Sequence, residues 1–380
     1  MEILTYTPEQ EDFRRRLRIF CETEVVPYVD QWEADRIVPK SVWRKMGAAG
    51  FLCPSVDPVY GGLGGDFRYS VIVAEALART AHTGLAAGLH SDVVVPYIDT
   101  YGSDALKRRY LPRCVSGECI TAIGMTEPDA GSDLAGMRTT AVEEGDSVIV
   151  DGAKTFISNG INCDLLVIAA RDPAVENKYE AMSLYVIEDG TPGFTRGRRL
   201  DKLGWHSQDT AELFFSNCRI PVGHRLGEKG MGFLMLMEKL QQERLTCAVG
   251  AVCGAEAILA WIVDYCRKNN RGGRPMAKSQ AVQFELVEMA ADVKVGRTFV
   301  DKLVADHIEK KNIVVETAMA KFWTTDMASR TADRALSILG DGGTTESCPI
   351  VRAWRDLRVM SIFAGTNEIM KGIAAKFMGL

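Results

Sequence analysis

The sequence predicts an α+β protein, mainly α, in which an N-terminal helical domain, a middle β-barrel domain and a C-terminal four-helix bundle follow one another. Three observations predict this order. Apolar residues recur at helical spacing before about residue 120, short β-rich runs fill 121–225, and long helical segments follow from 226. A chain of 380 residues is also too long for one compact core. We therefore expect domains at 1–120, 121–225 and 226–380.

The N-terminal region opens with a helix signal. Thr7 and Pro8 suit the N-cap and the first helical position, and Phe13, Leu17 and Phe20 follow at helical spacing. A Gly-rich loop at 60–66 lacks both the GxGxxG pattern and a preceding strand, so it is weak evidence for a phosphate site.

The middle and C-terminal regions differ in the pattern of their apolar residues. Short runs rich in β-branched residues, separated by turn residues, predict strands of a barrel or sandwich near 148–150, 165–170, 182–187 and 212–215. Four long periodic segments, separated by Gly and Pro clusters, predict the bundle helices at 230–268, 277–310, 315–338 and 347–378.

Composition excludes several classes of function. The net charge of −5 argues against nucleic acid as a partner. None of the ten cysteines forms a Cys-x-x-Cys pair, the five histidines match no metal pattern, and no secretory signal is visible, so we expect no metal site and a cytoplasmic protein. No apolar stretch looks long enough to cross a bilayer, so we expect a soluble protein with no membrane partner.

Four separated motifs carry the chemical information. They are Met125–Asp133 (MTEPDAGSD), Asp151–Asn159 (DGAKTFISN), Lys202–Phe215 (KLGWHSQDTAELFF), and Arg358–Met360 with Phe363–Ile369 (RVM and FAGTNEI). In this order they resemble the acyl-CoA dehydrogenase family. The resemblance implies bound FAD and α,β-desaturation of an acyl-CoA thioester by α-proton abstraction and hydride transfer to flavin N5.

The resemblance also implies the cofactor site. A turn rich in small residues exposes backbone donors and hydroxyls to the flavin edge, and an aromatic residue covers the ring. The family more often has Trp where this chain has Phe156. The implied flavin-binding residues are Ile123, Met125, Thr126, Ser132, Phe156, Ile157, Ser158, Thr366, Asn367 and Glu368.

The catalytic base is implied by a departure from the family pattern. Much of the family places a glutamate immediately before Gly-Thr, where this chain has Ala364. The long-chain and isovaleryl branches instead place the base in a Glu-Arg-Leu segment, which corresponds to Glu243 here. We therefore expect Glu243 to be catalytic. The residues implied to bind substrate are Ser132, Gln241, Gln242, Arg244, Ala364 and Gly365.

A second departure concerns assembly. Family members use an Arg near the second bundle helix to reach the FAD of a neighbouring subunit, but Asn269 and Gly272 alter that motif here. Arg271 or Arg274 could replace the usual cation. Other implied cofactor positions are Gln280, Ser337, Gly340 and Asp341. The resemblance implies a homotetramer, with electron-transfer flavoprotein as the electron acceptor.

Three alternatives remain open from the sequence. The enzyme could act on an acyl group held by a carrier protein, or it could be a flavin oxidase or monooxygenase of the same fold. A non-catalytic assembly protein is the third alternative, and the intact turn from Thr126 to Ser132 argues against it.

Overall fold

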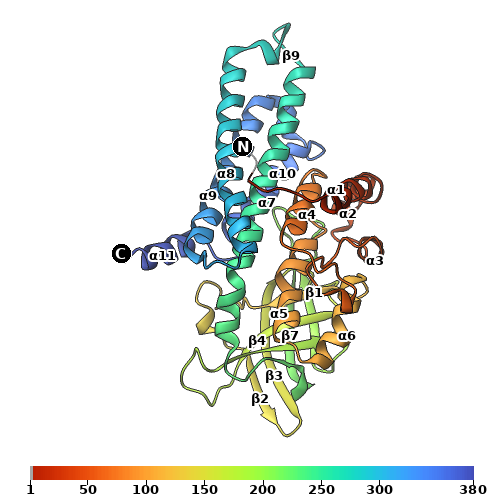
Figure 1. Ribbon diagram of the computed structural model, residues 1–380, viewed down its shortest axis with the longest axis vertical. Helices are drawn as coiled ribbons and strands as arrows, with labels where there is room; N and C mark the ends of the chain where they lie inside the picture. Colours follow the sequence, from red (N-terminus) through yellow and green to blue (C-terminus); the bar gives the residue numbers. More distant parts are fainter. Residues whose placement is uncertain (1–2) are drawn as a thin grey trace.

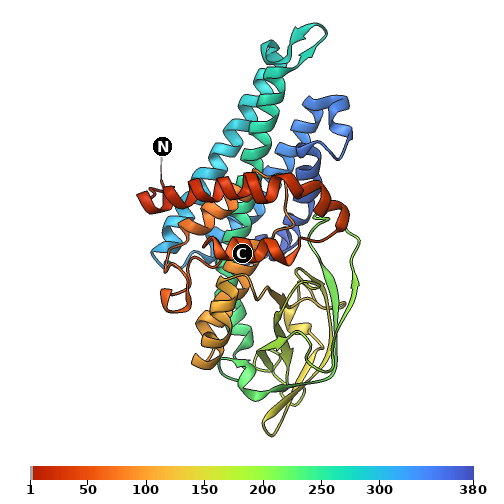
Figure 2. The ribbon, with the colours of Figure 1, turned by 90° about the vertical axis from the view of Figure 1, so that its right-hand side faces the viewer.

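The computed structural model describes residues 3–380. Helices form its N-terminal and C-terminal parts, and a β domain lies at one end of the elongated molecule (Figures 1 and 2). The predicted α+β, mainly α architecture is confirmed. The N-terminal helices are α1 (Pro8–Phe20), α2 (Val29–Asp35), α3 (Lys40–Ala48), α4 (Arg68–Ala78), α5 (Val95–Tyr101) and α6 (Asp104–Val115). Thr7 forms the predicted N-cap of α1, together with Gln10.

The middle part is one eight-stranded mixed sheet in the order β6-β7-β3-β2-β4-β5-β8, with β1 paired to β4. The paired strands follow one another in an open order and do not form a closed ring. Within this order β2 and β4 are joined by a single residue pair. The strands are β1 (Thr121–Gly124), β2 (Thr140–Glu144), β3 (Ser147–Ile157), β4 (Leu165–Arg171), β5 (Met182–Glu188), β6 (Phe194–Arg199), β7 (Ala211–Pro221) and β8 (Arg225–Leu226).

Strand β4 joins the β domain to the N-terminal helices. Leu165, Val167 and Ala169 pack into the core shared with those helices, whereas Leu166, Ile168 and Ala170 face the interior of the β domain. Because both faces of the strand are covered, its sequence is a continuous apolar run rather than an alternating one.

The C-terminal part consists of long packed helices: α7 (Gly232–Lys268), α8 (Gln280–Ile308), α9 (Val314–Leu339), α10 (Pro349–Leu357) and α11 (Asn367–Phe377). A small hairpin of β9 (Asn270–Arg271) and β10 (Arg274–Pro275) connects α7 to α8 at the far tip of the molecule (Figure 1). By length and composition alone α7 could cross a membrane, which the sequence analysis did not anticipate. In the structure it packs against α4, α8, α9 and α10.

The prediction of one helix over 347–378 was wrong. The segment ends as α10, continues as a 3-10 turn at Arg358–Ser361 and restarts as α11. Ala364 and Gly365 have φ values of 55° and 89°, which a right-handed helix does not allow, and Thr366 caps α11. Lys321 of α9 holds the break by donating from Nζ to the Gly365 carbonyl at 2.7 Å. The break turns Ala364 and Gly365 towards the centre of the molecule.

Candidate active site

A cavity of about 630 Å³ lies where the three parts of the chain meet. Its walls come from α4, the π-helical segment Leu89–Val94, the turn after β1, the end of β3, α7 and the break before α11. Most of the lining is apolar. Nine of the predicted substrate-side and flavin-side residues meet here: Ile123, Met125, Thr126, Ser132, Phe156, Ile157, Ser158, Ala364 and Gly365.

Glu243 faces this cavity from α7 and is buried. Burial raises the pKa of its carboxyl to about 7, against the opposing hydrogen bond from Tyr97 and the charges of Arg244 and Lys239. The hydroxyl of Tyr97, on α5, donates to Glu243 Oε1 at 2.7 Å. A carboxyl with this pKa is half ionised near neutral pH, which suits a general base.

Arg244 also lines the cavity and is buried, and its Nε has no hydrogen-bond partner within residues 3–380. Burial lowers the pKa of this guanidinium, and Glu243 opposes that effect. An unpartnered buried donor is costly unless a ligand satisfies it. Arg244 therefore has a free donor at the wall of the cavity.

Gln241 and Gln242, which the resemblance implied to bind substrate, do not line the cavity in this structure. Consecutive residues on an α-helix point about 100° apart, so the two neighbours that precede Glu243 face other elements. Gln241 bonds to the loop between α8 and α9, through Lys311 O and the Ile313 N–H. Gln242 donates to the carbonyl of Asp92 at 2.7 Å.

The flavin-side wall fits a bound FAD. Thr126, Ser132 and Ser158 line the cavity, and within residues 3–380 none of their hydroxyls is hydrogen-bonded to another protein group. Phe156 is 67% exposed and has a left-handed φ of 57°. A large aromatic residue held in that conformation is unusual, and it leaves a ring face free for a planar partner. The fold and this wall together define an FAD-dependent oxidoreductase.

A buried ion pair that the sequence did not reveal fixes the turn after β1. Lys154 of β3 donates from Nζ to Glu127 Oε1 at 2.7 Å, and both side chains are almost fully buried. The same carboxylate accepts from the backbone N–H groups of Arg138 and Thr139. The pair thereby anchors the turn that carries Thr126 and Ser132.

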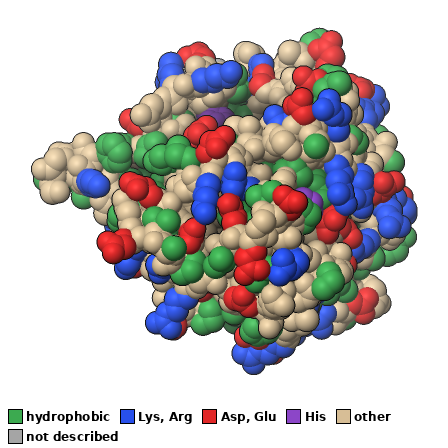
Figure 3. Space-filling view, turned by 90° about the horizontal axis from the view of Figure 1, so that it is seen from below, with side chains coloured by type: hydrophobic (Ala, Val, Ile, Leu, Met, Phe, Trp, Pro, Cys, Tyr) green, Lys and Arg blue, Asp and Glu red, His purple; other side chains and the backbone are tan. Residues whose placement is uncertain are grey.

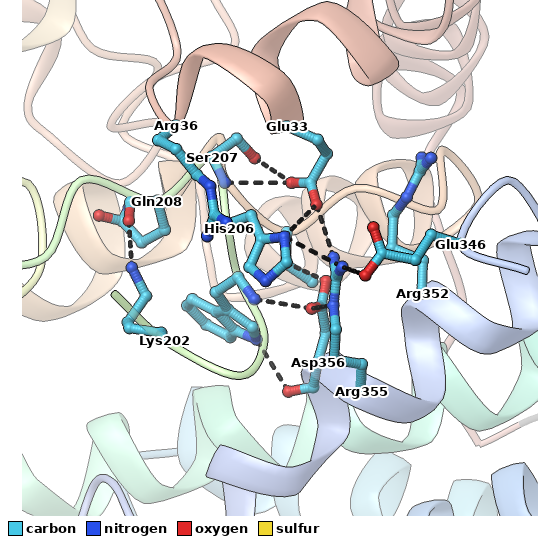
Figure 4. A network of polar contacts seen from close by, with 12 residues as sticks. Glu33, Arg36, Lys202, His206, Ser207, Gln208, Glu346, Arg352, Arg355 and Asp356 are labelled. Atoms are coloured by element: carbon cyan, nitrogen blue, oxygen red, sulfur yellow. Dashed lines mark hydrogen bonds and ion pairs between the residues drawn. The ribbon is translucent and has the colours of Figure 1, made fainter. Parts of the chain in front are cut away.

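A second network joins the three parts of the chain beside the cavity (Figure 4). Arg355 of α10 donates to Glu33 of α2 at 2.6 Å, and Glu33 accepts from the hydroxyl and backbone N–H of Ser207. Asp356, which lines the cavity, accepts from the Trp205 backbone N–H at 2.7 Å. The middle of the loop between β6 and β7 is thus tied to α10 through Trp205 and to α2 through Ser207.

The other predicted cofactor residues lie away from the cavity. Thr366 caps α11, Glu368 is exposed, and the side chain of Asn367 turns into the bundle, where it bonds to Lys321 and Asp326. Five more residues, exposed in the single chain, lie on the tip hairpin, at the start of α8 or near the end of α9: Arg271, Gln280, Ser337, Gly340 and Asp341. Arg271 donates to the Ile338 carbonyl, which holds the hairpin against the end of α9.

Comparison with known proteins agrees with this assignment. The N-terminal, middle and C-terminal domain models of acyl-CoA dehydrogenase match residues 7–118, 122–218 and 230–379. The long-chain specific mitochondrial enzyme of Sus scrofa is 38% identical over 98% of this chain and 86% of its own length. An acyl-CoA dehydrogenase structure from Geobacillus kaustophilus is 49% identical, with a TM-score of 0.96 over 99% of each chain.

A further solved structure, described as an electron transferring flavoprotein of Acidaminococcus fermentans, is 32% identical with a TM-score of 0.94 over 100% of this chain and 99% of that one. The chain belongs to the acyl-CoA dehydrogenase family. It is an FAD-dependent enzyme of fatty acid metabolism that desaturates acyl-CoA.

The sequence analysis missed three residues: Asp92, which lines the cavity, and Tyr97 and Lys321, which are hydrogen-bonded to residues that line it. Tyr97 and Lys321 act through hydrogen bonds between distant segments, and no local pattern indicates such contacts. Asp92 did leave a local signal. It is a charged residue directly before the apolar run Val93-Val94-Val95, a position where a helix that packs into a core usually carries an apolar residue.

Proposed function

We propose that Glu243 is the base that removes the α-proton of the acyl thioester. The observation that carries this proposal is a buried carboxyl with a pKa of about 7 that faces the cavity also lined by Ala364 and Gly365. Tyr97 occupies Oε1, so the second carboxylate oxygen is the one that takes the proton. When bound, FAD supplies the acceptor for the hydride that leaves Cβ.

An α-proton of a thioester is a very weak acid, so the developing enolate oxygen needs donors. We assign this role to the backbone N–H of Ala364, which the left-handed turn held by Lys321 supports. Replacement of the family glutamate by Ala leaves that backbone donor in place. The mostly apolar lining of the cavity excludes water from the reaction once substrate fills it.

The flavin is proposed to lie against Ile123, Met125, Thr126, Ser132 and the segment 156–158 of its own subunit. Five exposed residues near the tip of the bundle are proposed to complete the FAD site of a neighbouring subunit in a homotetramer: Arg271, Gln280, Ser337, Gly340 and Asp341. A cation with a spare donor at an exposed tip is suited to a pyrophosphate. Thr366 and Glu368, at the start of α11, are proposed to bind the same FAD molecule.

Electron-transfer flavoprotein is the proposed acceptor of the electrons, on the basis of the similarity to the Acidaminococcus fermentans structure.

A cytoplasmic location is supported by ten cysteines that are all unpaired, nine of them buried. On the face shown in Figure 3, basic and acidic side chains are interspersed rather than gathered in one patch.

The rescue experiment tests the position of the base. In the Glu243→Gln enzyme, introducing Ala364→Glu supplies a carboxylate from the opposite wall of the same cavity. We expect partial recovery of anaerobic flavin reduction by acyl-CoA, measured against Glu243→Gln alone. Matched Ala364→Gln in the same background is the control and should recover nothing. Equal rates in the two double variants would contradict the proposed arrangement.

A further inference from the structure

Asp92 is a second buried carboxyl in the wall of the cavity. It lies in the π-helical segment Leu89–Val94, and the structure buries it to 5% exposure. Pro96 has no N–H, so it cannot give the α-helical hydrogen bond to the Asp92 carbonyl. Gln242 of α7 supplies a donor to that carbonyl instead, at 2.7 Å. The Gln242 side chain therefore fixes the backbone at Asp92. Short π-helical turns inside α-helices are frequent at functional sites.

The carboxyl of Asp92 has one protein partner. Ser70 of α4 donates from Oγ to Asp92 Oδ1 at 2.6 Å, and within residues 3–380 no basic side chain forms an ion pair with it. Burial raises the pKa of Asp92 to about 7. Keeping a polar group in an apolar wall is costly unless its remaining hydrogen-bonding capacity is used. Oδ2 has no protein donor in the described structure.

Space is open in front of this oxygen. A Cβ built on Gly88 would lie 3.6 Å from Asp92 Oδ2 and 3.7 Å from the Thr246 side chain, and Gly88 carries no such atom. The other cavity-lining residues of α4 and of the π-helical segment are apolar: Val73, Ala74, Leu77, Ala78, Leu89 and Val93. In this part of the wall, Asp92 and Ser70 thus form an acid–hydroxyl pair among apolar side chains, beside the space that Gly88 leaves open.

The distance from the proposed base suits an acyl chain. Thr246, beside the open space, is three residues after Glu243 on α7, which is a rise of about 4.5 Å along the helix axis. A chain that places its α-carbon at Glu243 therefore extends about four carbons before it reaches this region.

We propose that Asp92 and Ser70 form a specificity subsite that binds a hydroxyl group carried by the acyl chain a few carbons beyond Cβ. The inference rests on the proposed function of Glu243, because that residue defines the position of the α-carbon. Asp92 Oδ2 accepts the hydrogen bond, and Ser70 fixes the other oxygen. The enzyme then discriminates in favour of hydroxyacyl thioesters over plain ones.

The test compares matched substrates and variants. The probes are octanoyl-CoA, 6-hydroxyoctanoyl-CoA and 6-aminooctanoyl-CoA, with hydroxyls at C5 and C7 to locate the best position. The proteins are the FAD-loaded wild type, Asp92→Leu, Asp92→Asn and Ser70→Ala. Two quantities are measured: kcat/KM for flavin reduction, and the dissociation constant by calorimetry in the Glu243→Gln background, where turnover is blocked.

For the wild type we expect a preference of roughly 10- to 100-fold for a hydroxyacyl-CoA, the range of one hydrogen bond to a charged group. Asp92→Leu should abolish the preference and bind octanoyl-CoA more tightly. Asp92→Asn should keep part of the preference, and Ser70→Ala should weaken it. The flavin spectrum and melting temperature report whether each variant is folded.

An unchanged hydroxyl preference in Asp92→Leu, or none in the wild type, would overturn the subsite. Tighter binding of the amino substrate than of any hydroxy substrate would overturn the hydroxyl assignment. The calorimetric preference does not depend on turnover, so failure of Glu243 as the base gives a different result: wild-type-like flavin reduction in Glu243→Gln.

Discussion

The phenol of Tyr97 donates a 2.7 Å hydrogen bond to Oε1 of Glu243 from a helix nearly 150 residues earlier in the chain. This bond orients the carboxyl and opposes the rise in its pKa that burial produces. The N-terminal domain thus contributes directly to the proposed base on α7.

Tyr97→Phe tests this relationship. Loss of the hydrogen bond removes a group that lowers the pKa of Glu243, so that pKa should rise above 7, by about one unit or more. The acidic limb of the pH profile of kcat/KM should therefore move to higher pH. Tyr101→Phe, on the same helix with its hydroxyl on exposed Glu238, is the control. An acidic limb at the same pH in Tyr97→Phe and wild type would rule out the proposed coupling.

For Asp92 the predicted effect is on stability, with a defined sign. The folded-state pKa of about 7 lies above the ordinary value of 3.8, so the folded protein binds more protons between these values. The associated stability is lost as pH rises through that window. Asp92→Asn should therefore raise the free energy of unfolding relative to wild type by about 1–3 kcal/mol at pH 8 and by less at pH 5. Melting curves at both pH values measure the difference, and a gain that is the same at both would contradict the raised pKa.

The ion pair of Arg355 and Glu33 should matter for stability far more than surface pairs do. Both side chains are at most 10% exposed, and Glu33→Gln removes one of the three carboxylates that pair with Arg355, the other two being Asp356 and Glu346. Losing a buried hydrogen bond to a charged group costs about 1.5–3 kcal/mol. Arg198→Ala, which removes an exposed pair with Glu212, is the matched control and should cost less than about 1 kcal/mol. Thermal unfolding compares the two, and similar melting temperatures would show that the network in Figure 4 adds little.

The buried pair of Lys154 and Glu127 is predicted to control cofactor retention. Lys154→Met leaves the Glu127 carboxylate buried and without its cation, so the turn bearing Thr126 and Ser132 should loosen. We expect FAD to dissociate at least about tenfold more readily than from wild type, as measured by flavin fluorescence after dilution. Lys40→Met, at a partly exposed pair with Asp164, is the control. Equal retention in both variants would show that the turn does not depend on this pair.

Features dictated by local patterns were predictable from sequence. The three-part order, the α1 cap at Thr7 and the strand β4 follow from periodicity and capping chemistry. The break before α11 was missed because Ala364 is a good helix former, and the contact from Lys321 to the neighbouring Gly365 carbonyl joins segments that are distant in the sequence.

The residues of the candidate site could likewise be predicted only in part. Glu243, Ser132 and Phe156 were predicted through motifs and meet in one cavity. Gln241 and Gln242 were assigned to the substrate through proximity in sequence alone, and the helical twist directs them elsewhere.

The central claim is that Glu243 is the base, and rapid-mixing measurement of flavin reduction in Glu243→Gln tests it most directly. Gln keeps the volume and the hydrogen bond to Tyr97 but cannot take the α-proton. FAD content and acyl-CoA binding should survive, while the rate of anaerobic flavin reduction by acyl-CoA falls by about 10²- to 10⁴-fold. A reduction rate close to that of the wild type would contradict the account.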